Sequence, residues 1–366
     1  MNAVLSPPTF QVEPRRFRPP SAALDRFAQR LGRERAAGKV SEAAFTYAVD
    51  ESRLDALVEG WCADADSGEA LLELTTFPWF RLAGPDTELC FVHRPAAERE
   101  ALPLLLLHGY WGSLTELSTL VEPLVSPADH GGTQSDAFAV VCPALPGFGI
   151  THAAGRTTAR ELGRACAKLM AQLGYERYVV HGSDLGACVA AEVAAQAPSH
   201  VAALHVTSLH AFPDESPEEL AALSSVEKSQ LALLTHEYEA LAHELPESPI
   251  EDLAYALRQL DDWTAPVSEY APLLRSLTAA WAFGDVTARR GLYASERLRP
   301  SPRFEVPVLL ETHALDAPCL RRFVQRHYRV RSVVEQARGG RLPALEATSQ
   351  LMASLRDGFR PFRATS

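Results

Sequence analysis

The sequence has few of the features that mark membrane, metal-binding or nucleic-acid-binding proteins. Its 366 residues contain no apolar run near the roughly 20 residues that a membrane-spanning helix needs. Lysine and arginine (35) are outnumbered by aspartate and glutamate (46), and the formal charge of −11 argues against nucleic acid or an anionic lipid surface as a partner. The twelve histidines show no HExxH or similar ligand spacing, so we expect no metal and no other cofactor.

Paired cysteines and a leader segment are also missing. The six cysteines are scattered without a CxxC pair, and several lie in apolar stretches, which indicates buried free thiols in a reducing compartment. Residues 1–8 show no basic stretch followed by an apolar one, so we expect no signal peptide. The prediction is a cytoplasmic protein without a membrane anchor, for which a homodimer is a possible assembly.

Apolar content and an alternation of strands with helices are what the chain does contain. Hydrophobic residues make up 47% of the chain, enough for a large core. Apolar runs alternate with helical patterns, which predicts an α/β fold with a mostly parallel sheet and helices on both faces. The expected strands are 88–93, 102–108, 138–142, 178–180, 201–206, 306–311 and 329–335.

Helices are expected between these strands and before them. Asp50 is a candidate N-cap for one early helix. Residues 1–20 are expected to form an extended arm, and residues 74–80 an apolar segment against a larger body. Between about 209 and 300 the strand pattern gives way to helices broken by prolines, which indicates a helical cap over the sheet. The other expected helices are 22–36, 114–124, 158–173, 185–197, 317–327 and 344–359.

The stretch 178–192 holds the motif around which the chain is organised. A β-branched run enters Gly182-Ser-Asp-Leu-Gly186, and an alanine-rich helical stretch leaves it. This pattern is typical of a nucleophile elbow, a tight strand-to-helix turn that exposes its central side chain. Asp184 stands at the centre, where a carboxylate suits displacement at a saturated carbon such as an epoxide carbon. The alternative role for Asp184 is to cap the following helix.

Four motifs together resemble the microsomal-type epoxide hydrolases, which have the α/β-hydrolase fold. They are His108-Gly-Tyr-Trp-Gly-Ser113, Cys142-Pro-Ala-Leu-Pro-Gly-Phe-Gly149, His181-Gly-Ser-Asp-Leu-Gly186 and Pro198-Ser-His-Val201. Residues 77–80 and 91–93 resemble the N-terminal extension of that family, and residues 248–263 resemble its cap. The resemblance covers nearly the whole chain and implies a small organic, epoxide-type substrate.

The resemblance also implies how the chain is divided. Residues 1–95 correspond to the N-terminal extension that wraps the core, and residues 96–208 to the first part of the α/β-hydrolase core. Residues 209–300 correspond to the helical cap, and residues 301–366 to the second part of the core.

Several residues take family roles by their positions in these motifs. Asp184 takes the position of the nucleophile, and the backbone N–H groups of Tyr110 and Leu185 take those of the oxyanion hole. Asp316 falls where the family has the acid of its charge relay, although it is equally placed to cap the next helix.

Two tyrosines of the cap complete the implied site. Tyr293, in Gly291-Leu-Tyr-Ala294, matches a cap tyrosine that hydrogen-bonds the epoxide oxygen, and Tyr238 corresponds to the second. The alternative for Tyr293 is a packing role against the core.

The general base departs from the family pattern. The family places its histidine in Gly-Gly-His-x-x-x-Leu-Glu, but residues 339–346 read Gly-Gly-Arg-Leu-Pro-Ala-Leu-Glu. Arg341 therefore replaces the base, and a guanidinium with a pKa above about 12 cannot accept a proton from water. We expect Arg341 to lie near Asp184 and Asp316 and to pair with them. Trp111 is a second departure, since the family has proline there.

Four interpretations of the chemistry remain open. The first is an enzyme that opens an epoxide or related electrophile without hydrolysis, with Asp184 as base or charge stabiliser and the substrate's own nucleophile closing a ring, a use that suits secondary metabolism. The second is true hydrolysis with a substitute base, for which His313 and His152 are candidates. The third is an inactive protein that binds a ligand or partner in the inherited pocket. The fourth, a dehalogenase, is disfavoured because Leu185 cannot donate the halide hydrogen bond of a tryptophan.

Overall fold

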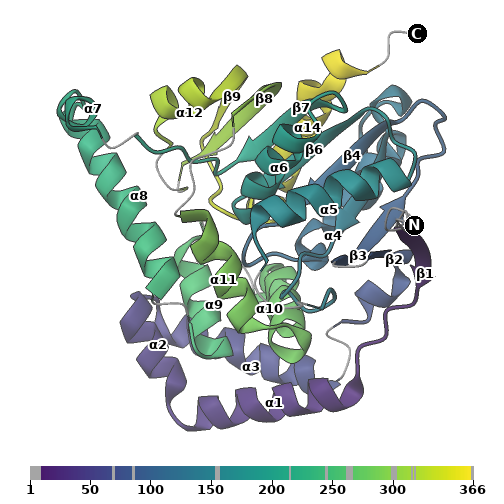
Figure 1. Ribbon diagram of the computed structural model, residues 1–366. Helices are drawn as coiled ribbons and strands as arrows, with labels where there is room; N and C mark the ends of the chain where they lie inside the picture. Colours follow the sequence, from purple (N-terminus) through teal and green to yellow (C-terminus); the bar gives the residue numbers. More distant parts are fainter. Residues whose placement is uncertain are drawn as a thin grey trace, which may run out of the picture.

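In a computed structural model the protein is built on one sheet of nine strands, with helices on both faces and a group of helices at one side (Figure 1). The structure describes residues 10–67, 71–84, 87–152, 157–213, 216–243, 246–260, 267–297, 303–314, 316 and 319–363. The strand order is β1-β2-β3-β5-β4-β6-β7-β8-β9. The expected α/β-hydrolase architecture, with a mostly parallel sheet and an N-terminal extension, is confirmed.

The N-terminal strands of the sheet are antiparallel and the later ones are parallel. Each of β1, β2 and β3 pairs with its neighbour in antiparallel fashion, and β3 also pairs antiparallel with β5. From β4 to β9 all pairings are parallel. The strands are β1 (Gln11–Arg15), β2 (Trp79–Gly84), β3 (Thr87–Arg94), β4 (Leu102–Leu107), β5 (Phe138–Pro143), β6 (Tyr178–Ser183), β7 (Val201–Thr207), β8 (Phe304–His313) and β9 (Tyr328–Gln336).

Both faces of the parallel part are buried, which explains its continuous apolar runs. On β4, Leu105 and Leu107 join the core beneath α5 (Ala159–Gln172) and α6 (Leu185–Gln196). Leu104 and Leu106 face the other way, into the core beneath α4 (Leu114–Val125) and α14 (Thr348–Phe359). Alternate side chains of one strand therefore serve two separate cores.

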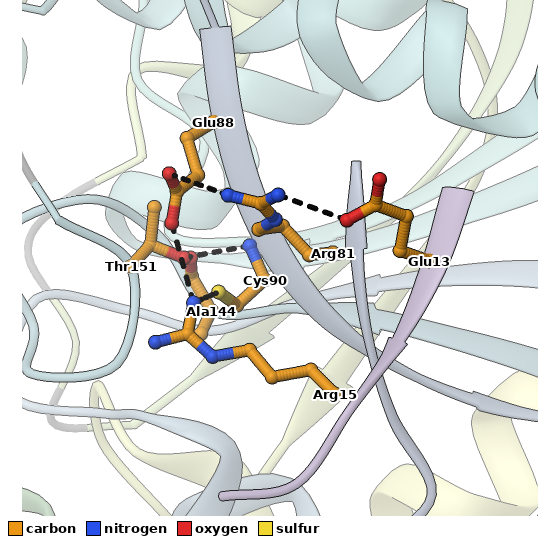
Figure 2. Close-up of polar contacts among 7 residues, drawn as sticks. All are labelled: Glu13, Arg15, Arg81, Glu88, Cys90, Ala144 and Thr151. Atoms are coloured by element: carbon orange, nitrogen blue, oxygen red, sulfur yellow. Dashed lines mark hydrogen bonds and ion pairs between the residues drawn. The ribbon is translucent and has the colours of Figure 1, made fainter. Parts of the chain in front are cut away.

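Polar side-chain contacts link the strands β1, β2 and β3 of the N-terminal extension, as the close-up in Figure 2 shows. Arg81 on β2 donates to Glu13 on β1 at 2.9 Å, and Arg15 lies 3.2 Å from Glu88. Arg15 also donates to the sulfur of Cys90, at 2.9 Å. Half-exposed ion pairs of this kind contribute about 1 kcal/mol or less, so the ladder of backbone hydrogen bonds is the main attachment.

The extension also supplies three helices, α1 (Ser21–Ala36), α2 (Lys39–Tyr47) and α3 (Glu51–Ser67). They lie beneath the helical insertion, which we define as α7–α11, between β7 and β8 (Figure 1). The Trp61 indole on α3 donates to the Thr278 hydroxyl on α10 at 2.8 Å, in a buried contact. The insertion consists of α7 (Pro217–Ala221), α8 (Ser225–His243), α9 (Pro249–Arg258), α10 (Ala271–Phe283) and α11 (Val286–Arg297). None of the helices in the described ranges is long and apolar enough to cross a membrane.

Most expected elements are present, and the differences have physical causes. The Asp50 carboxylate accepts the Arg53 N–H at 2.7 Å, as an N-cap does. Of the expected extended arm 1–20, residues 1–9 lie outside the described residues and residues 11–15 form β1, where Pro14 is tolerated because β1 is the outermost strand. The expected helix 344–359 is two helices, α13 (Pro343–Glu346) and α14, because Ala347 is not helical (φ −141°). The expected helix 317–327 begins only at Arg321 (α12, Arg321–His327), and α2 and β2 were not expected.

Candidate active site

The site lies where the order of the parallel strands reverses. From β4 the chain moves to β5 on one side and then to β6 on the other, so the loops after β4 and β6 diverge at the carboxyl ends of the strands. Such a crevice is the general ligand-binding position of open α/β sheets. The loop 108–113 and the elbow at residue 184 both emerge there.

The elbow is a strained turn that requires its glycines. Asp184 has φ 50° and ψ −117° between β6 and α6, and it is buried. A Cβ on Gly182 would lie 2.2 Å from the Gly186 carbonyl oxygen, and one on Gly186 would lie 2.5 Å from that of Leu107. Neither position admits a larger residue. A non-glycine residue at positive φ carries strain of order 1–3 kcal/mol, which is typical of functional positions.

The Asp184 carboxylate faces the loop after β4. It makes no cap hydrogen bond to its own helix, so the capping alternative is not supported. Its Oδ2 accepts the Tyr110 backbone N–H at 2.9 Å. The predicted oxyanion donor therefore lies beside the predicted nucleophile. Leu185 begins α6, where the first N–H groups have no acceptor within the helix, and its role as second donor stays a prediction.

A short turn carries the Tyr110 N–H. The Gly112 N–H donates to the Gly109 carbonyl at 3.2 Å, which places Tyr110 and Trp111 at the centre of a four-residue turn. A Cβ on Gly109 would lie 3.3 Å from that of Asp184, so the turn approaches the elbow closely.

Arg341 lies close to both aspartates. Its guanidinium is buried, with Nη1 at 3.9 Å from Asp184 Oδ1 and Nε at 3.9 Å from Asp316 Oδ1. Asp316 also accepts the Ser208 hydroxyl at 2.6 Å. Three charged side chains from distant parts of the chain thus meet in one buried site, where one cation compensates part of the negative charge of two carboxylates.

The loop that carries Arg341 is held by Glu346. Glu346 Oε1 accepts the N–H groups of Gly340 and Leu342, each at 3.1 Å. Gly339 has φ 92°, a conformation that favours glycine, and a Cβ there would lie 2.8 Å from the His313 ring. The Gly-Gly and the final Glu of this segment therefore shape the loop itself, whatever residue occupies position 341.

The two candidates for a substitute base, His313 and His152, differ in burial. His313 is buried, with Nδ1 at 3.0 Å from the Arg338 carbonyl and Nε2 at 3.0 Å from Glu311. Burial lowers the pKa of His313, but the contacts with Glu311 and Arg338 outweigh it and the pKa is raised. Both ring nitrogens are therefore engaged away from Asp184. His152 is exposed. This geometry does not favour either as the base.

Glu311 belongs to a buried polar network behind the site. His205 Nε2 lies 3.4 Å from its carboxylate, and the Nδ1 atoms of His205 and His181 are 3.1 Å apart. Burial raises the pKa of Glu311, but the two histidine contacts reverse this and hold it well below its usual range. The network supports β6, β7 and β8 just below the edge where the site lies.

Glu116 is a buried acidic residue beside the site that the sequence analysis did not single out. It lies on α4 and is fully buried, which raises its pKa to about 8, with the charge of Asp184 adding to the effect and the Gly109 amide opposing it. A Cβ on Gly112 would lie 1.6 Å from its Oε2, so the turn admits this carboxyl only because residue 112 is glycine. The available signal was an acidic residue between Leu114 and Leu117 on an apolar helix face.

The side chains of the two predicted tyrosines lie outside the described residues. The backbone of Tyr238 belongs to α8 and that of Tyr293 to α11. In the part of the chain that the structure describes, no group of three or more His, Cys, Asp or Glu residues could hold a metal ion.

Comparisons with known proteins point to one group. Residues 103–311, more than half of the chain, match the family model of the alpha/beta hydrolase fold, and residues 12–117 match the model of the epoxide hydrolase N terminus. The chain is 29% identical to the "Putative epoxide hydrolase" of Stigmatella aurantiaca over 381 residues, 96% of this chain and 86% of that protein. It is 29% identical to Epoxide hydrolase 1 of Oryctolagus cuniculus over 184 residues, 49% of this chain and 40% of that protein.

Solved structures agree on the fold. The Aspergillus niger epoxide hydrolase superposes with a TM-score of 0.72 at 21% identity, over 97% of each chain. The juvenile hormone epoxide hydrolase of Bombyx mori superposes with a TM-score of 0.72 at 20% identity, over 97% of this chain and 96% of that one.

Proposed function

Since the chain belongs to the α/β-hydrolase family and is a member of its epoxide hydrolases, we propose that it opens an epoxide or related electrophile of an organic substrate, with hydrolysis absent or non-standard. Asp184 acts as nucleophile or base. The observation that carries the proposal is the position of Arg341, whose guanidinium contacts both Asp184 and Asp316 at 3.9 Å.

The first half of the ordinary reaction needs only groups that this chain has. A carboxylate oxygen of Asp184 attacks an epoxide carbon, the C–O bond breaks, and the ring oxygen leaves with the electron pair and takes a proton. In our proposal Tyr238 and Tyr293 supply that proton. The second half needs a base that removes a proton from water, and an arginine cannot serve. The ester would therefore persist.

A reaction without water avoids this obstacle. If the substrate carries its own hydroxyl, that oxygen attacks the epoxide carbon while its proton passes to Asp184. The epoxide C–O bond breaks, and the proton on Asp184 is then passed to the new alkoxide. The product is a cyclic ether isomeric with the substrate, and Asp184 is regenerated as a carboxylate. Arg341 compensates the buried charge of Asp184 before the proton is taken up and after it is passed on. A substrate of this kind suits secondary metabolism.

The experiment is a turnover assay in heavy-oxygen water with an epoxy alcohol whose hydroxyl can close a five-membered ring. We expect the cyclic ether without heavy oxygen from the native protein, and no product from Asp184→Asn. Asp129→Asn, at an exposed carboxylate, is the matched control and should behave as the native protein does. A diol that contains heavy oxygen would establish hydrolysis instead.

The same samples distinguish the roles of Asp184 by intact-protein mass. A persistent increase equal to the mass of the epoxide, seen in the native protein and not in Asp184→Asn, would identify Asp184 as a nucleophile whose ester is not hydrolysed. Product without such an increase would identify it as the base. Neither product nor adduct across a varied panel of epoxides would contradict the proposal and favour a protein that only binds a ligand.

A further inference from the structure

A second buried charged cluster lies between the helical insertion and the turn 109–112. Its centre is Asp252 on α9, which is 2% exposed. Asp252 Oδ1 accepts the Trp111 indole N–H at 3.0 Å. Asp252 Oδ2 accepts the Trp281 indole N–H at 2.8 Å and a guanidinium N–H of Arg289 at 3.3 Å. Three consecutive helices of the insertion and the distant turn 109–112 therefore meet at one carboxylate.

Arg289 is enclosed as completely as Asp252. It is 1% exposed, and its guanidinium carbon lies 5.7 Å from the ring centre of Tyr110, 5.8 Å from that of Phe148 and 5.5 Å from that of Trp281. A buried ion pair contributes little net stability against an apolar replacement, but removing one partner is costly.

The cluster connects directly to the turn 109–112, which carries the Tyr110 N–H. Trp111 is the residue after Tyr110, and both are the central residues of the turn closed by Gly109 and Gly112. The Trp111 ring also meets Tyr255 of α9 edge-on, with ring centres 5.3 Å apart. Glycine at both ends leaves the turn few intrinsic restraints, so the anchored tryptophan restricts how the Tyr110 peptide can lie.

We propose that Asp252 is a positioning residue, which holds Trp111 and thereby fixes the Tyr110 N–H against Asp184. The inference rests on the proposed function, because it assumes that this N–H and Asp184 take part in the reaction. A hydrogen bond of 2.9 Å is sensitive to small movements, and a displacement of about 1 Å near reacting groups can cost about 100-fold in rate. Position 111 is also where this chain departs from the proline of the family that it resembles.

The test compares three variants by hydrogen–deuterium exchange and by steady-state kinetics with the epoxy alcohol. In Asp252→Ala and Trp111→Phe we expect amide exchange of the peptide covering residues 109–113 to rise about tenfold or more, because the anchor is lost. We expect kcat to fall about 10- to 100-fold with little change in KM. Asp252→Asn keeps an acceptor for Trp111 and should recover most of the protection and of kcat.

Asp136→Ala is the matched control, because Asp136 is also a buried carboxylate bonded to an arginine, Arg360, but lies away from the site. It should leave exchange in residues 109–113 unchanged. Equal exchange in Asp252→Ala and Asp136→Ala would overturn the inference, as would unchanged kcat with faster exchange. If the native protein turns over no epoxide, the proposed function fails, and the exchange comparison alone decides whether Asp252 positions the turn.

Discussion

Replacing Arg341 with histidine is expected to raise diol formation from a simple epoxide by about 10²- to 10⁴-fold, the usual contribution of a general base. Asp184 and Asp316, the proposed nucleophile and its acid partner, lie beside position 341. The loop that carries it is shaped by Gly339, Gly340 and Glu346, and the Arg341 guanidinium already contacts Asp184 and Asp316. Asp316 would orient an imidazole at position 341. The space vacated by the longer arginine side chain would hold a water.

The matched control is Arg341→Gln, which removes the cation without supplying a base. Both variants give up the ion pairs with Asp184 and Asp316, so both should lower stability, by about 3–5 kcal/mol for a buried pair that loses one partner. Diol formation in heavy-oxygen water is the measurement. An equal gain in both variants would mean that releasing Asp184 from the guanidinium is what matters, and no gain in either would mean that more than the base is missing.

Replacing Glu116 with glutamine is expected to remove a pH dependence of folding stability. The pKa of Glu116 is raised from 4.5 to about 8, chiefly by burial and secondly by the charge of Asp184. Between these two pH values the folded protein keeps the proton that the unfolded chain has lost. The contribution of protonated Glu116 to the free energy of unfolding is therefore complete below about pH 4.5 and is lost as the pH rises toward 8. One pKa unit corresponds to about 1.4 kcal/mol, so the loss amounts to a few kcal/mol.

Urea denaturation from pH 5 to 9 measures this effect as the difference between variants. The free energy of unfolding of the native protein should fall relative to that of Glu116→Gln as the pH rises, since glutamine is neutral throughout. Glu122→Gln, at an exposed position on the same helix, is the control and should keep the native slope. A native-like slope in Glu116→Gln would show that Glu116 is ionised in the folded protein at neutral pH.

The sequence predicted the parts of the molecule that depend on neighbouring residues. The elbow follows from two glycines at fixed spacing, and the structure shows that a Cβ at either would meet backbone atoms. The expected helix 158–173 is α5, and its start is also local, because Thr158 and Glu161 exchange hydrogen bonds there. The contacts of Arg341 with Asp184 and Asp316 were expected only through the resemblance, which aligned three distant positions.

What could not be predicted depends on long-range packing. Asp252 and Trp111 are 141 residues apart, and neither lies in a pattern that indicates the other. Glu116 has the spacing of an ordinary helix residue, and only the complete fold shows that Gly112 leaves room for its carboxyl beside the turn 109–112. The strand β2 has buried residues only at Trp79 and Leu82, not at alternate positions, so its periodicity gave no clear strand signal.

The antiparallel strands of the N-terminal extension have a consequence for any shortened form of this protein. Residues 91–94 of β3 pair with β5, whose six residues are all buried. A fragment that began at residue 96 would keep the pairing of β5 with β4 but would leave the amide and carbonyl groups that face β3 without partners along an apolar strand. Unpaired strands of this composition associate readily with other chains, so such a fragment should aggregate and not fold. The extension is best regarded as the protein's own protection against misassembly.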